Sequence, residues 1–295
     1  MLFFSNMEAA EQLIDSFEYE KAKEVLERDV LSVQPDNTDA LQLYAAVCIE
    51  LAIVTPAIEA LNRVILLNPQ LPEPYLALAQ LSDGLEALGF YVRGVDLFKH
   101  KENLSPDDKT QMSSAMCAVA ELYMTDLCDD AEAEAKCRAA LDSARVICES
   151  NPEIYKVQCD LMLVLGQVDE ANLAMADCLA KWADAEAQGK RMSFDFRLSV
   201  AKLLIEMQQF ERGEMILEGL IEEDDEAVLP WYLLGVSCVQ RLDSGCEDPD
   251  GDLRETAGEA FKQAERLLLA EPEQDRDCEL LDSIRQFLAS CGDAE

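Results

Sequence analysis

Residues 39–69 read DALQLYAAVCIELAIVTPAIEALNRVILLNP. The first half places apolar residues on one helix face, at spacings of three and four: Leu41, Tyr44, Ala45 and Cys48. The second half repeats this spacing with Ala57, Leu61, Val64 and Ile65. Asn68-Pro69 then ends the second pattern, because proline disfavours a continuing helix. Small residues stand where two helices would touch closely, so the stretch predicts a helical hairpin.

Similar pairs of helical patterns recur along the chain. Clear copies lie at residues 155–179, 200–221 and 231–272, and the copy at 9–35 carries one extra residue before its proline. Two copies are irregular: one covers residues 75–95, and the other opens with a capping box at Ser105 and Asp108. The second helix of that last copy, from about residue 129 to 149, looks about two turns too long.

The repeated order of small and large residues predicts an all-α, tetratricopeptide-repeat (TPR) superhelical solenoid of about seven helical hairpins. We expect one structural domain, with the solenoid over residues 1–272 and a capping helix and tail over residues 273–295. The apolar positions of the expected capping helix are Leu280, Leu281, Ile284, Phe287 and Leu288. The acidic stretch 222–226 reads as a turn and residues 242–256 as an inserted loop. A two-domain helical bundle is the alternative fold.

Negative charge dominates the chain. It has 60 acidic and 24 basic residues, which gives a formal net charge of −36, yet 49% of its residues are hydrophobic, enough to fold. Direct binding to nucleic acid or to an anionic membrane is therefore disfavoured, because both need clustered Lys and Arg. A basic protein is the favoured partner. No apolar stretch is long enough to span a membrane.

The chain shows little that could carry catalysis or bind a metal or cofactor. It has one histidine, His100, and no Gly-rich phosphate loop, nucleophile elbow or zinc-type Cys pair. Eight of the 11 cysteines fall mainly on apolar helix faces: Cys48, Cys117, Cys128, Cys137, Cys148, Cys159, Cys178 and Cys238. The first residues lack the features of a signal peptide, so we expect reduced thiols in the cytoplasm and nucleus. No enzyme activity, cofactor or metal is expected.

In a TPR stack the first helix of each hairpin lines the concave side. The outward positions of these helices are mostly acidic, with Glu11 and Asp15 in the first repeat and Lys156 and Lys202 as rare cations. Such a groove suits a Lys/Arg-rich extended segment. The residues expected to bind this client are Asp39, Glu50, Glu73, Tyr75, Glu121, Asp126, Glu153, Asp160, Asp195, Glu206 and Tyr232. The alternatives are that the acids only keep the protein soluble, and that Trp231 and Tyr232 belong to the core.

Three blocks carry a resemblance to a known family. Residues 122–128, LYMTDLC, are followed by Ala133-Glu134 and Cys137; residues 75–81 read YLALAQL; and residues 221–225, IEEDD, lead to WYLLG at 231–235. Together they resemble the dedicated assembly chaperones of large-subunit ribosomal protein four. The insertion at 242–256 matches nothing in that family, and the chain shows no long acidic tail.

The resemblance implies a chaperone that shields the basic internal extension of its newly made ribosomal client, accompanies it into the nucleus and releases it to RNA. No Lys/Arg run in this chain reads as an import signal, so the client is expected to carry one. We expect a monomer before client binding. A scaffold, or a carrier of histones or another basic protein, is the alternative. A dock for acidic chaperone tails is disfavoured, because the positions that would need Lys, Arg and Asn are acidic.

Overall fold

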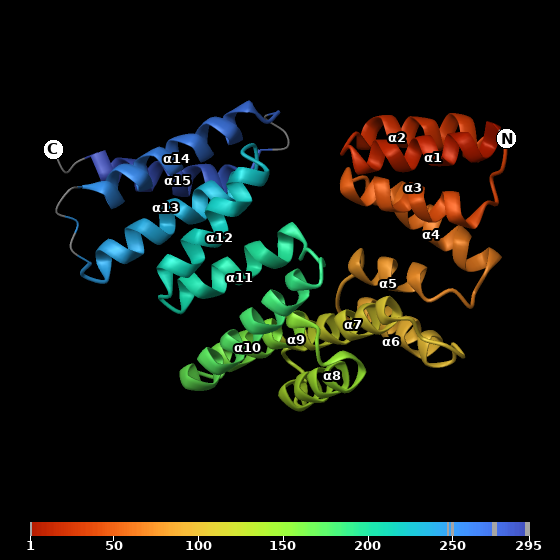
Figure 1. The fold of residues 1–295 in the computed structure, drawn as a ribbon, viewed down its shortest axis with the longest axis horizontal. Helices are drawn as coiled ribbons and strands as arrows, with labels where there is room; N and C mark the ends of the chain where they lie inside the picture. Colours follow the sequence, from red (N-terminus) through yellow and green to blue (C-terminus); the bar gives the residue numbers. More distant parts are fainter. Residues whose placement is uncertain (1, 247, 249–250, 273–275, 293–295) are drawn as a thin grey trace. The chain divides into compact units, whose positions relative to one another are not determined.

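The computed structural model describes residues 2–246, 248, 251–272 and 276–292, and every regular element among them is a helix (Figure 1). The chain divides into two compact units, Met1–Leu161 and Met162–Glu295. None of the described helices combines the length and hydropathy needed to cross a membrane. The prediction of one structural domain stays a prediction.

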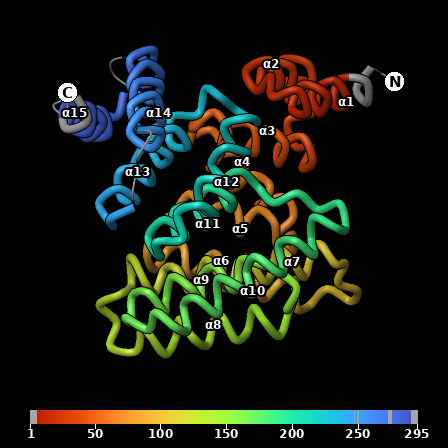
Figure 2. The backbone as a smooth tube through the Cα atoms, turned by 60° about the vertical axis from the view of Figure 1, so that its left-hand side comes forward, coloured from red at the N-terminus to blue at the C-terminus, as the bar shows by residue number. Residues whose placement is uncertain are grey.

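The first unit is a succession of helix pairs (Figure 2). Its helices are α1 (Leu2–Asp15), α2 (Tyr19–Val25), the π-helix η1 (Leu26–Leu31), α3 (Thr38–Glu50), α4 (Val54–Leu67), α5 (Glu73–Gln80), α6 (Gly84–Lys99), α7 (Pro106–Met124) and α8 (Ala133–Cys148). Within it α1 packs on α2, α3 on α4, α5 on α6 and α7 on α8, and consecutive pairs among α1–α7 contact each other. Helix α9 (Pro152–Val164) continues past the division between the units.

The second unit holds α10 (Val168–Ala187), α11 (Phe194–Glu206), α12 (Phe210–Glu223), α13 (Val228–Asp243), α14 (Asp252–Ala270) and α15 (Cys278–Gly292). Helix α11 packs on α12 and α13 on α14. Helix α15 packs on α14 and buries Leu281 and Ile284 against Phe261, as expected of a capping helix. Within the two units, six packed helix pairs are thus described, four in the first and two in the second before α15.

The positions read from the sequence form the core of the second hairpin. Leu41, Ala45, Leu61 and Val64 lie in one buried cluster, and Ala57 is also fully buried. Helix α3 begins where expected of a capped helix, because the Asn37 side chain accepts a 2.9 Å hydrogen bond from the N–H of Ala40. The predicted capping box at the start of α7 is confirmed: Ser105 and Asp108 each accept a hydrogen bond from the other's backbone N–H, at 3.0 and 2.8 Å.

The extra residue in the first repeat is absorbed by a π-helical turn. Residues Leu26–Leu31 form η1, in which the backbone bonds run from residue i to i+5 rather than i+4. Leu26 and Val30 are fully buried there, so the wider turn keeps both apolar side chains on the core side. A single inserted residue would otherwise rotate them away from α1 and α3.

Three expectations about helix bounds are wrong. The acidic turn expected over residues 222–226 is shorter, because residues 222–223 still belong to α12. The long helix expected from about residue 129 begins at Ala133 instead, because Asp130 accepts a 2.8 Å bond from the N–H of Glu132 and holds a turn there. The loop expected over residues 242–256 is shorter: residues 242–243 finish α13, and residues 252–256 already belong to α14. Residues 247, 249 and 250 of that loop lie outside the described residues.

Candidate functional site

Two adjoining hollows open on the first unit, and the first helices of successive hairpins supply most of their lining. One has a volume of about 300 Å³ and lies between α3 and α5; its lining includes Gln42, Ala46, Glu50, Glu73, Ala77 and Gln80. The other, of about 340 Å³, is bounded by α5, α7 and α9 and includes Glu73, Ala77, Gln80, Ser114, Ala118 and Glu153. Because the two share Glu73, Ala77 and Gln80, they form one continuous surface, here termed the α3–α9 groove.

Alanine makes the floor of this groove. Ala46 and Ala77 border the first hollow, and Ala77, Ala115 and Ala118 border the second. A methyl group leaves open the space that a leucine would fill, so successive first helices are separated by room for another chain. Glutamine and glutamate side chains share the lining with these alanines, so the groove offers both apolar contacts and hydrogen-bond acceptors.

Two of the predicted carboxylates already share a cation. Lys156 Nζ lies 2.8 Å from Glu121 Oε1 and 3.0 Å from Asp160 Oδ2, and its side chain is 15% exposed. Burial opposes the charge of Lys156, but the charges of Glu121 and Asp160 and the hydrogen bonds to both outweigh it, so its pKa lies above the ordinary value. Glu121 and Asp160 are therefore less available to an incoming cation than the other acids.

Glu153 and Glu73 are the acidic side chains in the lining of the second hollow. Burial, with a contribution from the charge of Glu121, raises the pKa of the Glu153 carboxyl group, although hydrogen bonds from Ser114 and Asn151 partly offset this. The buried Oε2 atom of Glu73 has no hydrogen-bond partner among the described residues. Both side chains line the second hollow, so negative charge gathers there without a full set of partners.

The raised pKa of Glu153 predicts a pH-dependent effect on stability. Between the ordinary pKa of 4.5 and the raised folded value, the folded chain keeps a proton that the unfolded chain has lost. The stability of the wild type therefore falls as pH rises through this window. The variant Glu153→Gln cannot ionise, so it is expected to unfold at higher urea concentration than the wild type near neutral pH. This gain should vanish below about pH 4.

The control for this comparison is Glu59→Gln, which removes an exposed carboxylate on α4. It is expected to show no such pH-dependent gain. A Glu153→Gln protein that is less stable than the wild type at neutral pH would contradict the raised pKa.

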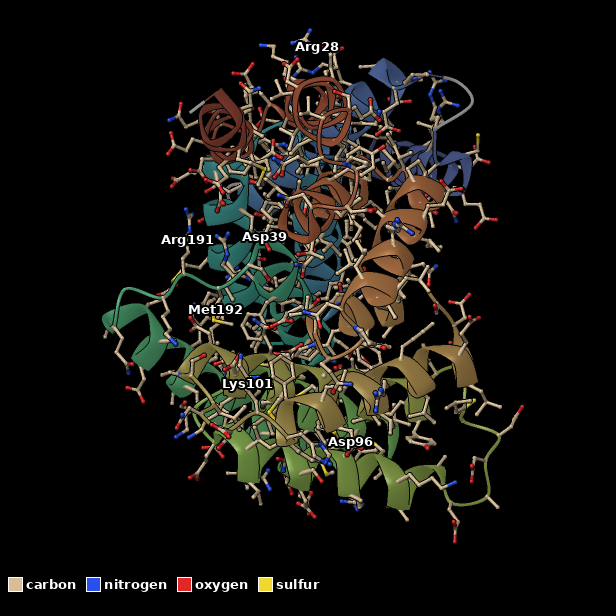
Figure 3. All side chains as sticks on the ribbon, turned by 90° about the vertical axis from the view of Figure 1, so that its right-hand side faces the viewer. Arg28, Asp39, Asp96, Lys101, Arg191 and Met192 are labelled. Carbon is tan, nitrogen blue, oxygen red and sulfur yellow. The ribbon has the colours of Figure 1, made fainter. Side chains whose placement is uncertain are left out.

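The other predicted residues of the first unit lie outside this charge cluster. Asp39 lies in the first turn of α3 (Figure 3), where a carboxylate also favours the helix N-terminus. The Asp126 carboxylate accepts a 2.8 Å bond from the Gly84 N–H and so fixes the start of α6. The Tyr75 hydroxyl donates to the Pro69 carbonyl at 3.3 Å. Glu50 borders the first hollow and is exposed.

Three predicted residues belong to the second unit. Asp195 and Glu206 are exposed at the two ends of α11. The Tyr232 ring lies 6.1 Å from Phe261 and 6.5 Å from Phe287, between centroids, and it packs against the core of α13, α14 and α15. This is the core placement that the sequence left open as the alternative. The structure thus brings Glu73, Glu121, Glu153 and Asp160 together in the first unit, while Glu50 borders only the first hollow.

Several residues of the groove escaped the sequence-based prediction because they are uncharged. Gln80 lies seven positions after Glu73, two helical turns along the same face, and Ser114 lies seven before Glu121. A search for polar residues at heptad spacing from each acid would have found them. Tyr91 comes from α6, a second helix, and the rule that first helices line the groove excluded it.

No group of side chains suited to a metal ion occurs among the described residues. His100 follows the last residue of α6, and its Nδ1 lies 2.7 Å from the Asp96 carbonyl oxygen. This exposed contact ties the ring to the last turn of that helix.

Comparison with known proteins identifies relatives by sequence. No family model matches the chain. A protein of Schizosaccharomyces pombe named "Probable assembly chaperone of rpl4" is 31% identical over 227 residues, which cover 73% of this chain and 68% of the relative. A protein of Emericella nidulans with the same name is 27% identical over 241 residues, 76% of this chain, and the match spans 61% of that relative's length.

Solved structures confirm the fold. The "Assembly Chaperone of RpL4 (Acl4)" superposes with a TM-score of 0.62 at 24% identity, over 81% of this chain and 96% of that one. A tetratricopeptide repeat protein from Parabacteroides merdae gives a TM-score of 0.53 at 13% identity, over 98% of each chain. Likeness at such identities shows the fold alone, and the fold is the all-α TPR solenoid expected from the repeats.

Proposed function

This chain belongs to the family of assembly chaperones of rpl4, and from that premise we propose that it binds a basic, extended segment of this ribosomal protein in the α3–α9 groove. The segment would stay soluble there until it is incorporated into the nascent large subunit. Both sequence relatives are named as chaperones, in agreement with the prediction that the chain is not an enzyme.

The observation that carries the proposal is the gathering of carboxylates over an alanine floor. Glu50, Glu73 and Glu153 border the two hollows, and Lys156, whose charge acts on Glu153, is held by Glu121 and Asp160. An extended peptide needs room for its backbone, which the alanines leave open, and acceptors for its cations, which the glutamates supply. The groove therefore fits a basic peptide better than an acidic or a purely apolar one.

A physical reason connects this surface with ribosome assembly. Segments rich in Lys and Arg bury too little apolar surface to fold alone, and in a ribosome RNA phosphates neutralise them. Carboxylates can take that place before assembly, and phosphates can later compete the segment away. The chain would accordingly act as a monomer before client binding, in the cytoplasm and nucleus, and without direct contact with nucleic acid or membrane.

Salt dependence of binding tests this proposal. The purified full chain is titrated with rpl4, and separately with its basic segment, from about 0.05 M to about 0.5 M salt. Affinity for both is expected to fall by at least about tenfold over this range, because screening weakens contacts between exposed charges. Circular dichroism of the chain alone over the same range controls for a salt effect on folding.

A histone-tail peptide of equal positive charge serves as the competing client. Preference for the rpl4 segment is expected, since charge alone does not set the register of a bound chain. Equal affinity for the two peptides would favour a general carrier of basic proteins, and salt-independent binding of rpl4 would rule out the acidic groove.

A further inference from the structure

Among the acidic side chains of the groove, Glu73, which borders both hollows, has a buried oxygen without a hydrogen-bond partner among the described residues. Asp126 binds the Gly84 N–H, and Glu121 and Asp160 bind Lys156. By contrast, the buried Oε2 of Glu73 makes no hydrogen bond among the described residues. A buried acceptor of this kind is costly to leave unsatisfied, so it points to a donor that arrives from outside the chain.

The volume and lining of the hollow indicate which kind of side chain carries that donor. Its volume of about 340 Å³ far exceeds the roughly 30 Å³ that one water occupies, and it lies in the range of small-ligand pockets. Leu76, Tyr91, Ala115 and Ala118 give it apolar walls, and Glu73 and Glu153 give it carboxylates. A lining that combines apolar side chains with carboxylates matches an aliphatic stem that carries a cationic head.

Neighbouring cations of the chain are engaged elsewhere. The ammonium group of Lys101, labelled in Figure 3, binds Asp108 at 2.8 Å; this hydrogen bond is the main cause of its raised pKa, to which the charge of Glu73 adds only a small part. Lys156 is held between Glu121 and Asp160. Neither lysine therefore satisfies the buried oxygen of Glu73, and the hollow remains open between α5, α7 and α9.

We propose that this hollow is an anchor pocket for a single long cationic side chain, lysine or arginine, of the bound client. Its stem lies on Ala115, Ala118 and Tyr91, and its head binds Glu73 and Glu153. The inference rests on the proposed function and deepens it. The exposed acids attract a basic segment, and this pocket selects the residue of the segment that binds in it. One buried anchor sets the register of an otherwise extended chain.

Filling the pocket without changing any charge tests the proposal. The variant Ala118→Leu adds apolar atoms to the pocket wall, and its matched control, Ala139→Leu, makes the same change on the exposed face of α8. The probe is a synthetic peptide in which arginine alternates with glycine and serine, together with its lysine and citrulline analogues. Titration calorimetry on the full chain measures affinity, and circular dichroism confirms that each variant is folded.

The expected result is a loss of at least about tenfold in affinity for the arginine and lysine peptides with Ala118→Leu, and no loss with Ala139→Leu. The citrulline peptide, which keeps the shape of arginine without its charge, should bind weakly to all proteins. The double variant Glu73→Gln/Glu153→Gln adds no volume and should lose affinity to a similar degree. Adding Ala118→Leu to this double variant should lower the affinity little further, because all three changes remove the same contact.

The outcomes separate this inference from the function on which it rests. A folded Ala118→Leu protein that binds the cationic peptides as tightly as the wild type would overturn the pocket, while salt-sensitive binding would leave the acidic groove in place. Binding by Glu73→Gln/Glu153→Gln at the wild-type affinity would overturn the pocket as well. Failure of the wild type to bind either cationic peptide at low salt would overturn both the pocket and the groove.

Discussion

Replacement of Glu50, Glu73 and Glu153 together by glutamine is expected to weaken binding of rpl4 by about a hundredfold. Glu50 and Glu73 border the first hollow, and Glu73 and Glu153 border the second, so the variant removes the charged acceptors along the α3–α9 groove. A charge-assisted hydrogen bond contributes about 1.5–3 kcal/mol, and partial exposure of these sites reduces the sum. Glutamine preserves the shape of each side chain, so the groove keeps its volume.

The control variant makes the same change in net charge on second helices. It replaces Glu24, Glu59 and Glu86 by glutamine; all three are exposed, on α2, α4 and α6. It is expected to alter the affinity less than about threefold, through long-range attraction alone. The affinities of the wild type and of both triple variants for rpl4, measured at one salt concentration, test this prediction. Equal losses in the two triple variants would show that only the net charge of −36 attracts the client.

The variant Phe261→Ala is expected to lower the free energy of unfolding by about 3–5 kcal/mol. Phe261 on α14 is fully buried, and its ring stacks on Phe287 of α15 with centroids 4.9 Å apart and planes 3° from parallel. The same ring covers Gly235 of α13, so it joins three helices of the second unit. Truncation would leave a cavity that these helices cannot close without moving. Denaturation in urea, followed by circular dichroism, measures the loss.

Gly235 supplies the matched test of this packing. A Cβ atom at that position would lie 2.8 Å from two atoms of the Phe261 ring, so Gly235→Ala is expected to destabilise the wild type by about 1–3 kcal/mol. In the Phe261→Ala background the clash is absent, and the better helix propensity of alanine should make Gly235→Ala neutral or stabilising. Additive losses in the double variant would contradict the close contact between Gly235 and Phe261.

Short-range sequence features accounted well for the individual helices. Ser105 and Asp108 form the predicted box because a cap depends on residues three apart, whose geometry the helix itself determines. The bounds of α8 were predicted less well. Asp130 can either continue a helix or bind the Glu132 N–H, and local composition does not decide between these competing bonds.

The candidate site was predictable in its chemistry but not in its assembly. Glu73, Glu121, Glu153 and Asp160 could be picked out as outward positions of first helices, since the repeat defines that face. It depends on which helices meet that Lys156 binds two of these acids, while an oxygen of Glu73 has no partner among the residues that the structure describes. Tyr232 shows the same limit: an aromatic ring suits a groove or a core, and its contact with Phe287 from α15 places it in the core.

The sequence by itself determined the helical repeat, the capping helix and the strong negative charge, because each depends on residue spacing or on composition. Only the tertiary structure decided which carboxylates share a lysine, that one oxygen of Glu73 has no partner within the described part of the chain, and where alanines line a hollow of about 340 Å³. These properties arise between helices that are distant in sequence, and the packing of side chains from several hairpins sets them. The number and positions of the charged residues follow from the sequence, whereas the solvation of each charge depends on the fold.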